Sequence, residues 1–324
     1  MDSDKHKAAE IGRRDFLSQL SIAVTASSLA LANSRGQSLP ADKTLSPAPL
    51  LPTIRLGNHR VTRLIVGSNP ISGYSYLGPI LDRHMREYFT PERIGEFLWA
   101  CEREGINTHQ FSRPEQMGPV FRKLRERGSK MNFICLHSDR STTSVKKVVN
   151  DTEPIAIVHH GGVTDKLFRE GKSGQVHDFV KRVKDAGVLA GVSAHNPDCI
   201  KRIADEGWQV DFFMTCFYYL TRTPEELKKM PPVVTVQIGY SFFASDPMTM
   251  TKVVRQVDQP CLGYKILAAG RMCDRDSKVE AAFNFAFENL KPTDGVIVGM
   301  YPRYQDQIRQ NAQYTRKYGL LRDT

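Results

Sequence analysis

The sequence predicts an α/β fold, a (β/α)8 TIM barrel preceded by a β-hairpin. Eight short apolar segments recur along the chain, and amphipathic helical segments separate nearly all of them. Short strands that are apolar throughout are typical of a parallel sheet covered by helices, and eight strand–helix units favour a closed barrel. No Gly-x-Gly-x-x-Gly motif follows the first strand, which disfavours an open dinucleotide-binding sheet.

Residues 1–32 resemble a twin-arginine export signal. Paired Arg13 and Arg14 precede Phe16 and an apolar run that closes on the small residues Ala30-Leu31-Ala32, the kind of site that signal peptidases cut. The apolar run is shorter than the ~20 residues that a membrane span needs. We therefore expect the twin-arginine translocase as a partner, a periplasmic or otherwise exported mature protein, and no stable membrane span.

The rest of the chain divides into a linker and one domain. Residues 33–52 are rich in Pro, Ser and Ala without periodicity, which is typical of a flexible tether. Residues 53–324 make up the predicted barrel. This domain opens with a hairpin that turns at Gly57-Asn58 and continues into the first barrel strand at 64–67.

The other strands and helices follow from hydrophobic periodicity and from helix start and stop residues. Thr90-Pro91 is a helix start, and Gly105 and Gly187 are helix ends. The further predicted strands are 105–112, 132–137, 154–160, 188–195, 210–219, 260–267 and 295–300. The predicted helices start at Thr90, cover about 115–127, run through Val148, and cover 175–187, 197–207, 277–290 and 303–319. An apolar, aromatic stretch at 231–243 adds a lid or an edge element.

Composition indicates a globular protein with a sizeable core, since 40% of the residues are hydrophobic and 25% are charged. The net charge is +10, but basic residues alternate with acidic ones. We therefore expect no nucleic-acid partner, and an anionic small molecule or envelope surface suits the charge equally well. The six cysteines form no Cys-x-x-Cys pair, so buried free thiols are expected, with one disulfide left open.

Polar residues gather at the predicted strand ends, where barrels of this kind build their active sites. Five of the nine histidines lie at four consecutive strand ends: His109, His137, His159, His160 and His195. The other polar residues there are Asn69, Gln110, Ser193, Cys216, Tyr218, Tyr219, Lys265, Tyr301 and Arg303. So many imidazoles on one face indicate a functional site.

The chain resembles the aldo/keto reductases, barrels that reduce carbonyls with NADPH. "RLGNHRVTRLIVGSNPISG" is similar to the family's opening hairpin and first strand, and "VIVGMYPRYQDQIRQNAQ" to its eighth strand and the following helix. "GIN" and "GVS" match the entry of the second strand and the fifth strand more weakly. The resemblance covers about 53–320 and implies an oxidoreductase that acts on a polar carbonyl or sugar-type small molecule.

The family's catalytic tetrad of Asp, Tyr, Lys and His is mostly replaced. Gln110 stands in the place of the Asp, and Glu115 falls near the place of the proton-donating Tyr. His137 takes the position of the Lys, and His159 or His160 that of the His. The catalytic candidates are therefore Gln110, His137, His159 and His160, and we expect weak or no reduction of simple aldehydes.

The resemblance also implies contacts to NADP. Ser193 matches half of the pair that binds the nicotinamide amide, and Tyr264 stands where the family stacks an aromatic ring on nicotinamide. Lys265 lies next to this position. At the adenine end the candidates are Arg303, Gln310 and Asn311.

Two alternatives stay open. In one, His137, His159 and His195 bind a divalent metal in a lyase, isomerase or hydrolase. If His137, His159 or His160, and His195 serve one site, their side chains should come within roughly 8 Å of one another, with Gln110 and Lys265 close by. In the other alternative, the barrel binds a ligand without catalysis.

Overall fold

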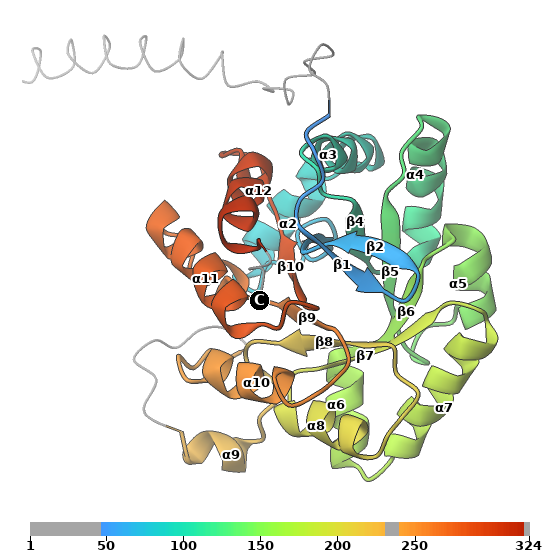
Figure 1. Cartoon of the computed structure of the whole chain (residues 1–324), viewed down its shortest axis with the longest axis vertical. Helices are drawn as coiled ribbons and strands as arrows, with labels where there is room; N and C mark the ends of the chain where they lie inside the picture. The colour runs from blue at the N-terminus through green and yellow to red at the C-terminus, as the bar shows by residue number, and fades with distance from the viewer. Residues whose placement is uncertain (1–46, 231–239, 321–324) are drawn as a thin grey trace, which may run out of the picture. The chain divides into compact units, whose positions relative to one another are not determined.

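A computed structural model describes residues 47–230 and 240–320, and its centre is a closed barrel of eight parallel strands. The last strand, β10, pairs with the first, β3, and the helices surround the strand ring (Figure 1). The strands are β3 Leu64–Gly67, β4 Thr108–Phe111, β5 Asn132–His137, β6 Ala156–His159, β7 Leu189–Ala194, β8 Phe212–Cys216, β9 Cys261–Tyr264 and β10 Gly295–Gly299. The predicted (β/α)8 barrel is confirmed.

The helices of the described residues include four that the sequence analysis did not predict: α2, α6, α9 and α10. Helix α6 opens on Gly161-Gly162, which are poor helix formers, so its sequence signal is weak. The helices are α2 Pro79–Tyr88, α3 Pro91–Arg103, α4 Pro114–Glu126, α5 Val145–Thr152, α6 Gly161–Arg169, α7 Ser173–Asp185, α8 Pro197–Asp205, α9 Pro224–Lys228, α10 Asp246–Val254, α11 Asp276–Asn289 and α12 Gln307–Tyr318, with a 3-10 turn at Ala268–Gly270.

The predicted hairpin consists of β1 Thr53–Leu56 and β2 His59–Thr62, which pair antiparallel. Ile54, Leu56 and Val61 are buried with the inward side chains from the strand beginnings, so the hairpin closes that end of the barrel. Its turn rests on β7, because a Cβ at Gly57 would lie 2.8 Å from Leu189 Cδ2. Gly57 has φ +54°, a conformation that favours glycine.

Two apolar layers determine which side of each strand faces inward. One buried cluster fills the barrel interior and includes Ile65, Ile134, Val158 and Leu262. The other lies between the strands and the helices and includes Val66, Phe133, Ile157 and Phe179. Because side chains alternate along a strand, these two clusters assign each polar residue at a strand end to the interior or to the helix layer.

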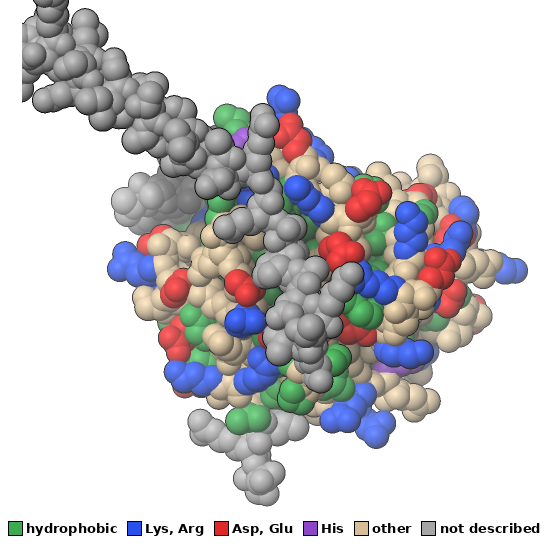
Figure 2. All heavy atoms as spheres, turned by 90° about the horizontal axis from the view of Figure 1, so that it is seen from above, with side chains coloured by type: hydrophobic (Ala, Val, Ile, Leu, Met, Phe, Trp, Pro, Cys, Tyr) green, Lys and Arg blue, Asp and Glu red, His purple; other side chains and the backbone are tan. Residues whose placement is uncertain are grey.

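Several other expectations can be compared with the described residues. All six cysteines are free, five of them buried, so the disulfide left open is not formed. None of the described helices combines the length and the apolar character that a membrane crossing requires. Lys and Arg side chains are interspersed with Asp and Glu on the face in Figure 2. The signal, most of the linker and residues 231–239 of the extra stretch lie outside the described residues.

Candidate active site

Three of the strand-end histidines point away from the barrel interior. Leu136 and Val158 pack on the inner cluster, so the residues that follow them, His137 and His159, face the helix layer. His137 and His159 are paired in register, and the rings of both lie against Phe179 of α7. His137 Nε2 lies 2.9 Å from Thr143 O, and His159 Nδ1 lies 2.7 Å from Thr164 Oγ1.

His109 also faces the helix layer and is fully buried, with Nδ1 2.9 Å from Val66 O. Burial lowers the pKa of His109 and of His159 to about 4 and also lowers that of His137. These three imidazoles are therefore neutral at pH 7. Each packs in the helix layer and makes one hydrogen bond through a ring nitrogen, while His109 Nε2 is buried without a partner among the described residues.

This placement corrects the expected convergence of histidines. His195 faces the interior whereas His137 and His159 face the helices, so the three cannot form one ligand set. Among the described residues no group of three His, Cys, Asp or Glu side chains is arranged to hold a metal. His159 is the last residue of β6, whereas His160 is the N-cap of α6.

The interior side of the strand ends carries a second set of polar side chains. Val192 and Ala194 pack in the helix layer, so Ser193 and His195 point into the barrel mouth. Gln110 also faces inward, since its neighbours His109 and Phe111 face outward, and its Nε2 donates to Phe111 O. His160 follows inward-facing Val158 and reaches solvent at the mouth.

A buried carboxylate orients His195. Asp165, on α6, has a fully buried side chain, and its Oδ2 lies 2.9 Å from His195 Nδ1. The same carboxylate accepts hydrogen bonds from the backbone N–H of His195 and of Asn196 and from Thr221 Oγ1. An ionised carboxylate only accepts, so His195 carries its proton on Nδ1 and presents Nε2 as a base.

Electrostatics keep this base neutral. Burial lowers the pKa of His195, while the hydrogen bond to Asp165 acts in the opposite direction. Partial burial, then the neighbouring imidazole of His195 and the positive charge of Lys265, lower the pKa of His160. Both inward imidazoles are therefore available as proton acceptors near pH 7.

Lys265 supplies a positive charge beside His195. Its Nζ lies 4.6 Å from the ring centroid of Tyr264 and 4.8 Å from that of Tyr76, in cation–π contact with both. Burial alone would lower the pKa of Lys265, but Tyr76, Cys216 and Tyr240 together outweigh this effect and the pKa is raised. Lys265 is therefore an ammonium at neutral pH, which suits an anionic oxygen and disfavours a Schiff base.

The backbone is strained where Lys265 meets Tyr76. Their φ angles are +60° and +62°, in the left-handed region that non-glycine residues rarely adopt. Strain of this kind persists only where the surrounding structure imposes it, and it is common at functional sites. Both residues lie in loops that follow barrel strands, at the mouth.

Gly161, the first residue of α6, packs closely against three side chains of the mouth. A Cβ at this position would lie 2.9 Å from Ser193 Oγ, 3.0 Å from Tyr264 Oη and 3.3 Å from His195 Cε1. Ser193 Oγ donates to Tyr264 Oη at 3.1 Å, and burial raises the pKa of Tyr264 far above its usual value, so the phenol stays neutral. Only glycine lets the start of α6 approach these groups so closely.

The side chains that the resemblance assigns to nicotinamide contact one another and their neighbours. Ser193 and Tyr264 bind each other, Gly161 packs against both hydroxyls, and Lys265 occupies one face of the Tyr264 ring. At the predicted adenine end Arg303 is exposed beside the rings of Tyr88 and Tyr304, while Gln310 is half-buried and Asn311 is buried on α12.

The sequence analysis missed Asp165, Gly161 and Tyr76. Asp165 lies in the second turn of α6, shortly after the end of β6, so sequence could have placed it near the mouth only if α6 had been predicted. The close approach of Gly161 depends on side chains from β7 and β9. Tyr76 lies in the loop after the first strand, where sequence alone offers only an aromatic residue among serines and glycines.

Comparison with known proteins supports the fold. No protein-family model and no curated protein matches the chain. The chain is similar to solved structures of a Gox0644 mutant in complex with NADPH (11% identity, 85% of this chain and 90% of that one, TM-score 0.50) and of the glycerol dehydrogenase AKR11B4 from Gluconobacter oxydans (13%, 81% and 90%, 0.48). It is also similar to truncated 3-deoxy-D-arabino-heptulosonate 7-phosphate synthase from Thermotoga maritima (12%, 85% and 92%, 0.47).

These identities show the barrel fold alone. The similar structures also include a putative 2,5-diketo-D-gluconic acid reductase B (9% identity, 82% of this chain and 86% of that one, TM-score 0.47). Fold and site together define a (β/α)8 barrel protein with an Asp–His pair and a lysine ammonium at its mouth.

Proposed function

We propose that this protein is an enzyme that moves a proton on a polar carbonyl or sugar-type small molecule, with His195 as the base. The observation that carries the proposal is the Asp165–His195 pair, because it fixes the tautomer and leaves Nε2 without a partner among the described residues. An imidazole oriented in this way is an effective general base near neutral pH.

The proposed step needs no group beyond the site. His195 Nε2 takes a proton from the carbon next to a carbonyl, and the electron pair of the broken C–H bond moves to the carbonyl oxygen. The Lys265 ammonium stabilises the resulting negative oxygen. Return of the proton to the opposite face of the same carbon completes an epimerisation. Return to the former carbonyl carbon, while the proton of the neighbouring hydroxyl passes to the former carbonyl oxygen, completes an isomerisation of a hydroxy-carbonyl compound.

The same geometry favours proton transfer over NADP-dependent reduction. The reductase proposal depends on Ser193 and Tyr264 as nicotinamide contacts, and these two side chains bind each other. Exposed Arg303 is the residue that suits a cofactor phosphate. Titration of the protein with NADPH, followed by fluorescence, tests this second proposal, and Arg303→Gln should weaken any binding that occurs.

Hydrogen exchange in D2O tests the proton-transfer proposal across several classes of carbonyl compound at once. Aldoses, ketoses and 2-keto acids are incubated with the protein, and loss of C–H signals is followed by NMR. We expect exchange to disappear in His195→Gln and to persist in His137→Gln, whose imidazole faces the helices. Exchange that survives in His195→Gln contradicts the assignment, and ligand binding without exchange favours a non-catalytic barrel.

We also propose export through the twin-arginine translocase, on the basis of Arg13, Arg14 and the apolar run after them. Replacing both arginines with lysine should leave the protein uncleaved in the cytoplasm. Normal processing of the double variant would contradict export by this route.

A further inference from the structure

The hairpin that closes the barrel places two arginines directly opposite each other. Arg55 of β1 and Arg60 of β2 are partners in the antiparallel register. Their strand neighbours Ile54 and Val61 point into the barrel, so both arginines lie on the outer face, where they are exposed. Side chains directly opposite in such a pair have Cβ atoms about 4.5–5.5 Å apart, and like charges there repel.

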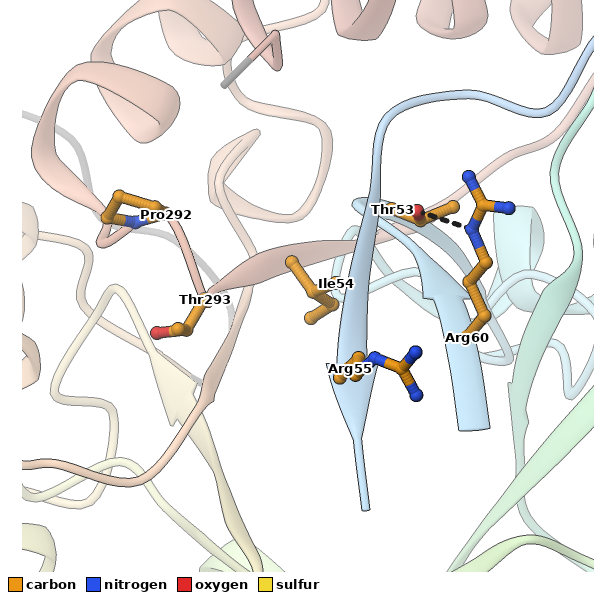
Figure 3. A pocket seen from close by; sticks show the side chains of 6 residues that line it. All are labelled: Thr53, Ile54, Arg55, Arg60, Pro292 and Thr293. Atoms are coloured by element: carbon orange, nitrogen blue, oxygen red, sulfur yellow. Dashed lines mark hydrogen bonds between the residues drawn. The ribbon is translucent and has the colours of Figure 1, made fainter. Parts of the chain in front are cut away.

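No carboxylate of the described residues neutralises this pair. Arg60 Nε donates to Thr53 Oγ1 at 2.9 Å, which orients its guanidinium and leaves the Nη groups available to a ligand (Figure 3). Within 47–230 and 240–320, neither Arg55 nor Arg60 forms an ion pair. Figure 3 shows both guanidinium groups on the side of the hairpin away from Pro292 and Thr293.

The scaffold under the pair is rigid. Asn107 Nδ2 and Asn132 Nδ2 both donate to Arg60 O, at 2.8 and 3.3 Å. Thr62 N donates to Asn107 Oδ1 and Thr62 Oγ1 accepts from Asn107 N. The two guanidinium groups therefore stand on a backbone that is tied to Asn107, just before β4, and to Asn132 of β5, so little ordering of the backbone is needed when a ligand binds.

Arg63, three residues further on, is used differently. Its buried guanidinium donates to the carbonyls of Asp294, Gly319 and Lys291, so its hydrogen-bonding capacity serves the fold. Arg55 and Arg60 have no such structural use. The adjoining surface hollow of about 490 Å³, lined in part by Ile54 and Pro292, leaves room for the rest of a ligand.

We propose that Arg55 and Arg60 together bind a phosphate-type oxyanion at the end of the barrel opposite the candidate active site. Two planar guanidinium groups match the several acceptor oxygens of a phosphate, and the bound anion cancels the repulsion between them. The oxyanion is either a free phosphorylated small molecule or the headgroup of an anionic phospholipid. This inference is independent of the proposed proton transfer.

The test uses the full chain and the variants Arg55→Gln, Arg60→Gln and the double variant. Arg122→Gln is the matched control, since Arg122 is exposed on α4, away from the hairpin. One arm titrates inorganic phosphate at constant ionic strength by calorimetry. The other measures cosedimentation with phosphatidylcholine vesicles with and without phosphatidylglycerol.

We expect binding in at least one arm, weakened about tenfold or more by the double variant and unchanged by Arg122→Gln. Phosphate binding identifies a free oxyanion as the ligand, and binding confined to anionic vesicles identifies the headgroup. Melting temperatures without ligand should be equal or higher in the double variant, because the like-charge pair is gone. No binding in either arm, or an equal loss in Arg122→Gln, overturns the proposal.

Discussion

Replacing Asp165 with Asn should invert the tautomer of His195 while the fold persists. The carboxylate accepts five hydrogen bonds, two at Oδ1 and three at Oδ2. If the amide oxygen keeps the Oδ1 position, its NH2 group faces His195 Nδ1 and Thr221 Oγ1. The hydroxyl can rotate to accept, but the imidazole must give up its Nδ1 proton and carry it on Nε2.

The size of the effect follows from the bonds that change. Hydrogen bonds to a charged group contribute about 1.5–3 kcal/mol each, and removing a buried charge offsets part of the loss. We expect the free energy of unfolding to fall by roughly 2 kcal/mol. Activity should suffer more, because an Asp–His pair with the wrong tautomer loses on the order of 10⁴ in rate.

The assay is long-range 1H–15N correlation of protein labelled on histidine, with His195 assigned by its loss in His195→Gln. The native signal should show Nδ1–H, and the Asp165→Asn signal should show Nε2–H. Asp294→Asn is the control, since Asp294 is equally buried but binds Cys261 N and Lys291 N. Nε2–H in the native protein, or an unchanged tautomer in the variant, would refute the reasoning.

Three further predictions follow from the contacts at the strand ends. Gly161→Ala should lower the free energy of unfolding by about 1–3 kcal/mol through overpacking, and by less when Ser193 is already alanine. If urea unfolding gives the same loss with and without Ser193→Ala, the contact with Ser193 Oγ is contradicted. His159→Ala should lower the free energy of unfolding by roughly 2–4 kcal/mol, because it leaves a cavity against Phe179. The variant should still exchange substrate C–H hydrogen in D2O. Lost exchange with unchanged stability would contradict the outward placement of His159. Buried His109 has a pKa of about 4, below its ordinary value, so the unfolded chain binds a proton at a higher pH than the folded protein does. The free energy of unfolding should therefore fall as the pH drops from 7 toward 4, by roughly 2 kcal/mol at pH 5. Urea unfolding of His109→Leu should show a weaker dependence of this free energy on pH.

The sequence alone was sufficient for the architecture. Eight apolar segments with intervening helical periodicity predicted the barrel, and Gly57-Asn58 predicted the hairpin. These signals are local, because a strand's composition and a turn's glycine act within a few residues. The same locality explains the missed helix α6, whose two opening glycines weaken its pattern.

Sequence also located the end of the barrel that carries the candidate site, since polar residues followed the apolar strands. Ser193, His195, Tyr264 and Lys265 do lie at the mouth. It could not decide which side of a strand each residue occupies. Strands that are buried on both faces read as continuous apolar runs, so they lack the alternation that would distinguish inside from outside.

Only the tertiary structure decided that His159 belongs to the helix layer and that His195 belongs to the mouth. It also brought Asp165, from an unpredicted helix, against His195, and it placed Lys265 between two tyrosines. These choices depend on barrel closure and on the packing of α6 against β7, which join residues about 30 positions apart in the sequence. The sequence therefore determined which polar residues lie at the mouth, while long-range packing decided which of them is oriented as the proposed proton acceptor.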